Sequence, residues 1–171
     1  MTHYEKWDKR FLGLTDHVAQ WSKDPSTKVG AVIVRQDRTI ASIGYNGFPR
    51  GVIDSDERYN DKQTKYNFVC HAEANAILNA KEPLHNCTIY VSPLFPCKDC
   101  AKLIIQSGIW SVVAREPKLE RWQSSYDVSL DMFKETNTLI TTYKKEEDVK
   151  EICINENIQP NWAGCLPPMA C

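Results

Sequence analysis

The sequence predicts one α/β domain built on a mixed, five-stranded sheet that is covered by helices. After residue 70, helical stretches alternate with short β-rich runs, which favours parallel strands joined by crossover helices. Nearer the N-terminus, two β-rich runs are separated by only a short polar turn, which is typical of a hairpin and makes the sheet mixed. The chain of 171 residues suits one domain of ordinary size.

A helix is expected over residues 4–22, because apolar side chains recur there at intervals of three and four. They are Trp7, Phe11, Leu14, Val18 and Trp21. Pro25 ends this stretch, since the residue before a proline is pushed away from helical geometry. The hairpin follows, with strands at 29–34 and 39–45 around a turn at 36–38.

Residues 46–66 are expected to form a long polar loop, which is uncommon in a compact domain and favours a functional role. Helix and strand then alternate, and the domain ends at residue 143. Residues 144–171 show no periodicity and are expected to be an extension that is mobile or docked on a partner. The expected elements are helices at 72–81, 99–107 and 122–136 and strands at 88–91, 109–114 and 138–143.

Composition excludes several classes of protein. With 42% hydrophobic and 25% charged residues the chain is of ordinary globular type, so disorder and fibrous repeats are ruled out. The apolar runs, such as residues 31–34, are far shorter than the roughly 18 residues that a membrane span needs. The first ten residues contain no signal-peptide core, so we expect a cytoplasmic protein. A net charge of −1 gives no attraction for polyanions and counts against a duplex or tRNA partner.

Three metal-ligand side chains stand where two helices are expected to begin. His71 opens one helix and the pair Cys97 and Cys100 opens the next. Two thiolates and an imidazole suit Zn²⁺, and helix N-termini stabilise thiolates. Because each helix follows a strand, both N-termini can meet at the same edge of the sheet.

A closed zinc site with four ligands and a redox Cys-x-x-Cys are the alternatives. Cys70 is the nearest fourth ligand, but it is adjacent to His71 and would usually point the other way. Three protein ligands leave the fourth position for water, which is the catalytic arrangement. An odd total of seven cysteines argues against a disulfide framework, so the five outside the pair are expected to be free thiols. The remaining histidines, which have no partner at ligand spacing, are expected at the surface or in packing contacts: His3, His17 and His85.

Glu73 lies two residues after His71, too near to be a convenient ligand. A glutamate in the first turn of a helix is often only a surface residue that the helix dipole favours. From this position, however, its carboxylate can reach a water on the metal, take a proton from it and redeliver that proton. We therefore expect Glu73 to be a base and proton shuttle.

The chain resembles a known family over about residues 7–114. The segments HAEANAIL and PCKDCAKLIIQSGI resemble the cytidine deaminase-like superfamily, whose signature pairs His-x-Glu with Cys-x-x-Cys. The segments DPSTKVGAVIV, GYNGFPRG and KYNFVCHAEANAILNA are similar to deoxycytidylate (dCMP) deaminases. The resemblance implies a three-layer α-β-α cytidine deaminase-like fold. It also implies Zn²⁺-dependent hydrolysis of dCMP to dUMP and ammonia, which supplies dUMP for thymidylate synthesis.

The resemblance also assigns roles to single residues. The zinc ligands correspond to His71, Cys97 and Cys100, and the acid/base to Glu73. Asn46 corresponds to the residue that hydrogen-bonds the deoxyribose, although its position before Gly47 also suits a plain turn residue. The backbone N–H of Ala72 would face O2 of the pyrimidine. Ser26 and Lys28 would approach the phosphate, with a solvated loop as the alternative.

Further properties implied by the resemblance are a homo-oligomer, in many members a hexamer, and regulation by dCTP and dTTP. The loop at 46–66 is the natural place for an effector site. Two departures from the family bear on the substrate. The family's Asp-Lys-Tyr segment, which helps to hold the phosphate, is replaced by residues 115–121, where Lys118 and two arginines can supply charge. An extra residue also stands before the cysteines, in the segment 92–97.

Three alternative functions remain open from the sequence. Deoxycytidine or dCTP would be the substrate if the enzyme does not select a monophosphate. A deaminase of single-stranded nucleic acid would need a cationic, aromatic-lined groove, and basic and acidic residues are interspersed here. A non-catalytic zinc module would have no use for Glu73.

Overall fold

A mixed sheet forms the centre of the fold in the computed structural model, which describes residues 3–116, 122–144 and 150–151. Its strands in spatial order are β2 (Ile40–Tyr45), β1 (Gly30–Val34), β3 (Thr88–Ser92), β4 (Ser111–Arg115), β5 (Leu139–Tyr143) and β6 (Lys150–Glu151). β1 is antiparallel to β2 and β3, whereas β3, β4 and β5 are parallel. The five expected strands and the mixed character are confirmed. The two-residue β6 adds an antiparallel edge within the segment expected to be an extension, and the rest of that extension after residue 144 lies outside the described residues.

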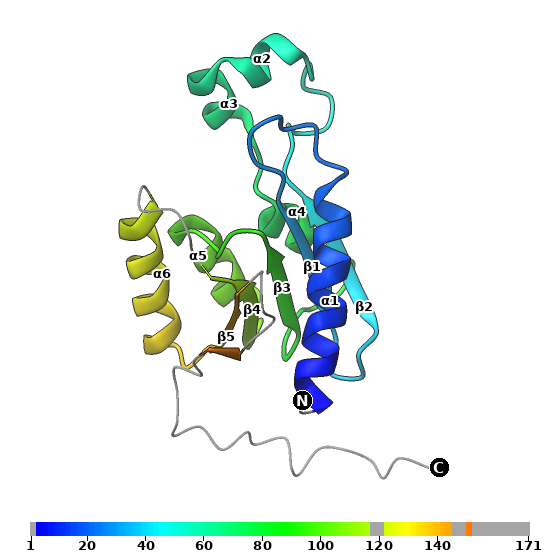
Figure 1. The fold of residues 1–171 in the computed structure, drawn as a ribbon, viewed down its shortest axis with the longest axis vertical. Coiled ribbons are helices and arrows are strands. Elements are labelled where there is room, and N and C mark those ends of the chain that lie inside the picture. The colour runs from blue at the N-terminus through cyan, green and yellow to red at the C-terminus, as the bar shows by residue number, and fades with distance from the viewer. Residues whose placement is uncertain (1–2, 117–121, 145–149, 152–171) are drawn as a thin grey trace.

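Helices cover both faces of the sheet and produce three layers (Figure 1). α1 (His3–Ala19) packs on one face against β1 and β3. α4 (Ala72–Asn79), α5 (Lys98–Gln106) and α6 (Gln123–Glu135) belong to the other layer. Alternate residues of β1 serve the two layers, because Val32 and Val34 pack with α1 while Ala31 and Ile33 pack in the core beneath α4.

The expectation of an irregular loop over 46–66 is wrong in its second half. Residues in this segment form α2 (Asp56–Asn60) and α3 (Lys62–Phe68). α3 begins because the side chain of Asp61 caps it, accepting a hydrogen bond from the Thr64 N–H at 2.7 Å. Helices this short leave too few turns for a 3.6-residue pattern to be visible in the sequence. The two helices project beyond the end of the sheet (Figure 1).

The first helix also differs slightly from its expected extent. α1 ends at Ala19 rather than at residue 22, and Trp21 lies in the turn beyond it with 48% of its surface exposed. Phe11 and Val18, from the same expected stripe, are buried in the core. None of the helices in the described residues is long and apolar enough to cross a membrane.

Strand register brings three chain segments to one edge of the sheet. Gly30, at the start of β1, pairs with Tyr45 at the end of β2 and with Ser92 at the end of β3. The loop before β1 therefore meets the residue after β2 and the loop that leads from β3 into α5. The N-terminus of α4 reaches the same edge because α4 packs closely on β2 at Gly44, where an added Cβ would lie 2.3 Å from the Ala76 nitrogen.

Candidate active site

The three metal-ligand side chains converge as expected. His71 and Cys97 are the residues immediately before α4 and α5, and Cys100 lies in the first turn of α5. His71 Nδ1 lies 3.4 Å from Cys97 Sγ and 3.4 Å from Cys100 Sγ. A tetrahedral zinc site, with Zn–N of about 2.0 Å and Zn–S of about 2.3 Å, separates a nitrogen and a sulfur ligand by about 3.5 Å. Both nitrogen–sulfur distances therefore fit a tetrahedral zinc ion, and all three donor atoms lie within 4.8 Å of one another. In the described part of the chain, no other group of three such side chains converges in this way.

Without a metal, two of these donors hold protons, His71 and Cys100, and a bound divalent cation would displace both. A hydrogen bond with Cys97 raises the pKa of His71 to about 9. Hydrogen bonds from Cys100 and then His71 lower the pKa of Cys97 to about 4, whereas the pKa of Cys100 is raised because it donates to Cys97 and is buried. Only one of the two sulfurs can thus be a thiolate on its own, and a bound cation is what stabilises the second.

Glu73 lies beside these donors in the first turn of α4, with only 4% of its surface exposed. Burial is the largest cause that raises the pKa of its carboxyl group above the usual value. A carboxyl group with a raised pKa takes up and releases a proton more readily near neutral pH. Its position and environment are those of a general acid/base.

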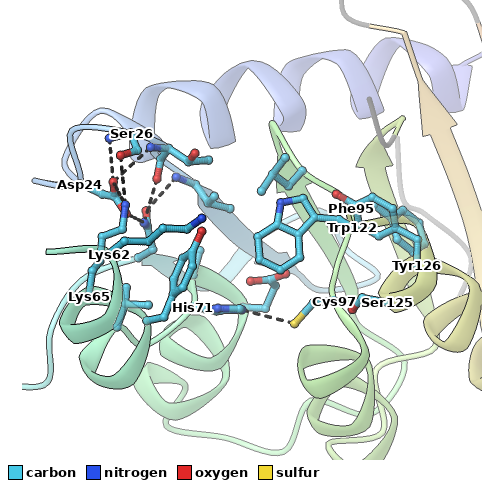
Figure 2. Close-up of a pocket in the computed structure, with 18 residues that line it drawn as sticks. Asp24, Ser26, Lys62, Lys65, His71, Phe95, Cys97, Trp122, Ser125 and Tyr126 are labelled. Carbon is cyan, nitrogen blue, oxygen red and sulfur yellow. Dashed lines mark hydrogen bonds and ion pairs between the residues drawn. The ribbon is translucent and has the colours of Figure 1, made fainter. Parts of the chain in front are cut away.

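A pocket of about 300 Å³ is lined by His71, Cys97 and Glu73. This volume falls in the range of small-molecule sites. One wall is apolar and aromatic, and includes Phe95, Trp122 and Tyr126 (Figure 2). The Trp122 ring meets the Tyr66 ring of α3 edge to face, with centroids 6.3 Å apart. The cavity thus has an apolar wall that suits a flat ring, and this wall faces the metal donors and Glu73.

The far end of the pocket is polar and is built on a buried ion pair. Lys65 Nζ of α3 lies 3.1 Å from Asp24 Oδ1, and it also donates a hydrogen bond to Ser26 Oγ at 3.1 Å. Asp24 in turn accepts hydrogen bonds from the N–H groups of Ser26 and Thr27, at 2.8 and 3.1 Å. These bonds fix the loop before β1 against α3 (Figure 2).

Most of the sequence-predicted binding residues line this same pocket. Ala72 and Ser26 do so, and Ala72, as the first residue of α4, has an N–H without an acceptor inside the helix. Asn46 also lines it and is buried. Its Oδ1 accepts a hydrogen bond from the Val29 N–H at 2.8 Å and its Nδ2 donates to the Thr27 carbonyl at 2.9 Å.

Lys28 is not among the residues that line the pocket. Its ammonium group lies 3.5 Å from the Gln20 carbonyl oxygen, beyond the end of α1. Of the segment 115–121, which departs from the family pattern, the structure describes only Arg115 and Glu116, so the expected contribution of Lys118 lies outside the described residues. Arg115 is buried and its Nη2 donates to Asp16 Oδ2 at 3.1 Å.

Sequence reasoning missed the pocket residues that α3 contributes: Lys62, Lys65 and Tyr66. The capping pattern of Asp61 and Thr64 could have revealed the helix, in which the two lysines are one turn apart, but not its position at the pocket. Trp122, the residue immediately before α6, also lines the pocket.

Other sequence predictions concern residues away from the pocket. His17 and His85 are exposed, as expected, and the His3 side chain lies outside the described part. Cys70 and Cys87 are free thiols, and Cys87 is buried. The remaining three cysteines lie in the undescribed tail.

Comparison with known proteins points to one family. A family model described as "Cytidine and deoxycytidylate deaminase zinc-binding region" matches residues 5–116, a span that includes all three metal donors and Glu73. An uncharacterized deaminase from the luxG 3′ region of Aliivibrio fischeri is 47% identical over 139 residues, which cover 80% of this chain and 92% of that protein. The deoxycytidylate deaminase of Homo sapiens is 45% identical over 121 residues, or 67% of each chain.

Solved structures support the fold. The dCMP deaminase of cyanophage S-TIM5 in its apo form superposes with a TM-score of 0.64 at 23% sequence identity, covering 83% of this chain and 99% of that one. The same protein in complex with dCMP and dUMP gives a TM-score of 0.64 at 24% identity, covering 83% of this chain and 98% of that one. The three-layer α/β architecture is therefore shared with a dCMP deaminase.

Proposed function

The chain belongs to the cytidine and deoxycytidylate deaminase family, and from that premise we propose that it is a zinc-dependent hydrolase that converts dCMP and water to dUMP and ammonia. The observation that carries the proposal is the convergence of His71, Cys97 and Cys100 beside the buried carboxyl group of Glu73, at the floor of one pocket. The dUMP formed is a precursor for thymidylate synthesis.

The choice of dCMP is supported by the relatives. Proteins named deoxycytidylate deaminase from Homo sapiens and Mus musculus are 45% and 46% identical to this chain. The structural neighbour from cyanophage S-TIM5 is a complex with dCMP and dUMP. A free nucleotide also suits a cavity of about 300 Å³ and a chain whose net charge is −1.

Zn²⁺ would be held by His71, Cys97 and Cys100, whose spacing and donor types fit it. When bound, this ion supplies Lewis acidity, which lowers the pKa of a coordinated water from its value in bulk to about 7. The helix N-termini behind His71 and Cys97 favour negative charge at the donors.

Glu73 moves the protons of the reaction. Its carboxylate removes a proton from the attacking water and delivers it to N3 of the cytosine ring as the new bond forms at C4. The carboxylate then takes the remaining proton from the new C4 hydroxyl and passes it to the departing amine, so that the C4–N bond breaks, ammonia leaves and the C4 carbonyl of dUMP remains. Because Glu73 is nearly excluded from solvent, these transfers occur without competition from bulk water.

The other contacts orient the nucleotide. The Ala72 N–H, an orphan donor at a helix N-terminus, would bind the pyrimidine O2. Asn46 would bind the deoxyribose through the second lone pair of Oδ1, because Nδ2 already donates its two hydrogens to the Thr27 carbonyl and to Asp24 Oδ2. Ser26 and Lys28 were assigned to the phosphate end from the sequence, and Ser26 is the one of these that lines the pocket.

Family membership also underlies several broader proposals. The catalytic domain comprises residues 1–143 and residues 144–171 form an extension to it. The enzyme acts in the cytoplasm as a homo-oligomer, with a hexamer as the expected size. dCTP activates it and dTTP inhibits it, through a site bordered by the segment 46–66.

The substitution Glu73→Gln tests the chemistry. It keeps the size of the side chain but removes its ability to carry a proton. We expect kcat on dCMP to fall by a factor of about 10²–10⁴, which is the contribution that a general acid/base makes. Zinc content, measured by atomic absorption, should remain at one ion per chain. Substantial turnover by the zinc-loaded variant would contradict the role assigned to Glu73.

A further inference from the structure

Three charged side chains line the polar end of the pocket: Asp24, Lys62 and Lys65. Asp24 and Lys65 neutralise each other across 3.1 Å, and both side chains are nearly buried. Ser26 holds both partners, because its hydroxyl accepts from Lys65 and its N–H donates to Asp24. Turning either charged group toward a ligand would leave the other buried and unpaired, which is strongly unfavourable. This pair is therefore fixed and contributes no net charge to the pocket.

Lys62 is different. It lies one turn before Lys65 in α3, is exposed, and also lines the pocket. Its ammonium nitrogen lies 5.8 Å from the centroid of the Tyr66 ring. No ion pair joins Lys62 to a carboxylate in the described part of the chain. Figure 2 shows its side chain reaching from α3 toward the middle of the cavity.

We propose that Lys62 determines the preference for a phosphorylated nucleoside, by placing its ammonium group against the 5′-phosphate of the bound nucleotide. This inference rests on the proposed function, which places the pyrimidine beside Glu73 and His71. The sugar then carries the phosphate toward the polar end of the pocket, where the charge of Lys62 is uncompensated. An ammonium group offers three donors on a flexible stem, and its hydrogen bonds to phosphate are strengthened by charge.

Lys28 is the weaker candidate for this contact because its ammonium group lies outside the pocket. Val29, the neighbour of Lys28, lines the pocket, whereas Lys28 itself lies against the Gln20 carbonyl. Lys62, rather than Lys28, is therefore the lysine placed to contact the phosphate that distinguishes dCMP from deoxycytidine.

The test compares Lys62→Gln, Lys28→Gln and Lys81→Gln with the unmodified enzyme on dCMP and on deoxycytidine. Lys81 is exposed and does not line the pocket, so its substitution controls for the loss of one positive charge. For Lys62→Gln we expect KM for dCMP to rise about tenfold, which is the lower end of the effect of removing a charged hydrogen bond. kcat on dCMP and kcat/KM on deoxycytidine should change less than twofold. Lys62→Arg, which retains the charge, should recover most of the lost affinity.

Several results would overturn the inference. One is an unchanged KM for dCMP in Lys62→Gln. Another is an equal loss on dCMP and deoxycytidine, which would indicate a structural role in α3. A third is a KM increase in Lys28→Gln alone, which would assign the phosphate contact to Lys28.

Failure of the proposed function has a different signature, because the unmodified enzyme itself would then not turn over dCMP. In that case calorimetric binding of dCMP and deoxycytidine to the unmodified protein and to Lys62→Gln decides the inference separately. A loss of dCMP affinity in the variant supports it, and equal binding by the two proteins overturns it.

Discussion

At the scale of single residues, the Asp24–Lys65 pair connects stability to the pocket. Its two side chains are only 6% and 8% exposed, and it joins the loop before β1 to α3 across 41 residues of sequence. A buried ion pair stabilises the fold little more than two apolar side chains would. The loss of one partner, however, leaves the other charge buried without a counter-charge. The pair therefore serves mainly to fix the position of α3 and of the loop before β1 at the polar end of the pocket.

We predict that Lys65→Met lowers the free energy of unfolding by about 3–5 kcal/mol, because Asp24 is left buried without a counter-charge. The double variant Asp24→Asn/Lys65→Met should recover part of this loss, since no unpaired charge remains. Urea denaturation of the zinc-loaded proteins measures both quantities. If the double variant loses as much free energy of unfolding as Asp24→Asn and Lys65→Met lose together, the two residues are not energetically coupled.

At the scale of secondary-structure elements, the metal site depends on how closely α4 lies on β2. Gly44 allows this contact, because a Cβ at that position would lie 2.3 Å from the Ala76 nitrogen and 2.4 Å from the Ala72 oxygen. Backbone atoms cannot give way as a flexible side chain can. Any side chain at residue 44 must therefore push α4 outward, and His71 and Glu73 move with it.

Gly44→Ala should lower the free energy of unfolding by about 1–3 kcal/mol, as overpacking typically does. It should also weaken zinc binding in a chelator competition assay. The matched control is Gly13→Ala in α1, where an added Cβ meets nothing within 4 Å. That variant should be stabilised by up to about 1 kcal/mol, because alanine is the better helix former. Normal stability and zinc affinity in Gly44→Ala would show that α4 can shift without consequence.

The elements also show what a sequence can and cannot reveal. The five strands and the helices of the two layers were predictable because their apolar periods report burial directly. The metal donors were predictable because His-x-Glu and Cys-x-x-Cys lie next to predicted helix starts. α2 and α3 were missed because helices of five and seven residues carry no readable period. Their existence depends on local bonds such as the Asp61 cap.

Lys28 and Lys62 illustrate the same limit at the binding site. Lys28 lies within the segment DPSTKVGAVIV, which resembles the family, but the direction of its side chain is set by the turn into β1 and by the end of α1. Lys62 is more than 30 residues from Lys28 in sequence. It reaches the pocket because α3 packs against the loop at Asp24. Such convergence is a property of tertiary packing, which neither spacing nor composition encodes.

At the scale of the whole molecule, charge and cavity size favour a free nucleotide over a polymer. A net charge of −1 provides no long-range attraction for nucleic acid, and the polar end of the pocket holds only local positive charge. A nucleotide also avoids the cost of extruding a base from a stack. Net charge and a pocket of about 300 Å³ therefore favour the same class of substrate.

The central claim, hydrolytic deamination of dCMP, is tested most directly by product analysis. The zinc-loaded protein is incubated separately with dCMP, deoxycytidine, dCTP and a single-stranded oligonucleotide that contains cytosine, and the dCMP reaction is repeated with dCTP and with dTTP as effectors. We predict that dCMP is converted to dUMP with one ammonia released per molecule, at a higher kcat/KM than the other substrates, and that the effectors change this rate. Failure to form dUMP from dCMP, or faster conversion of the oligonucleotide, would contradict the account.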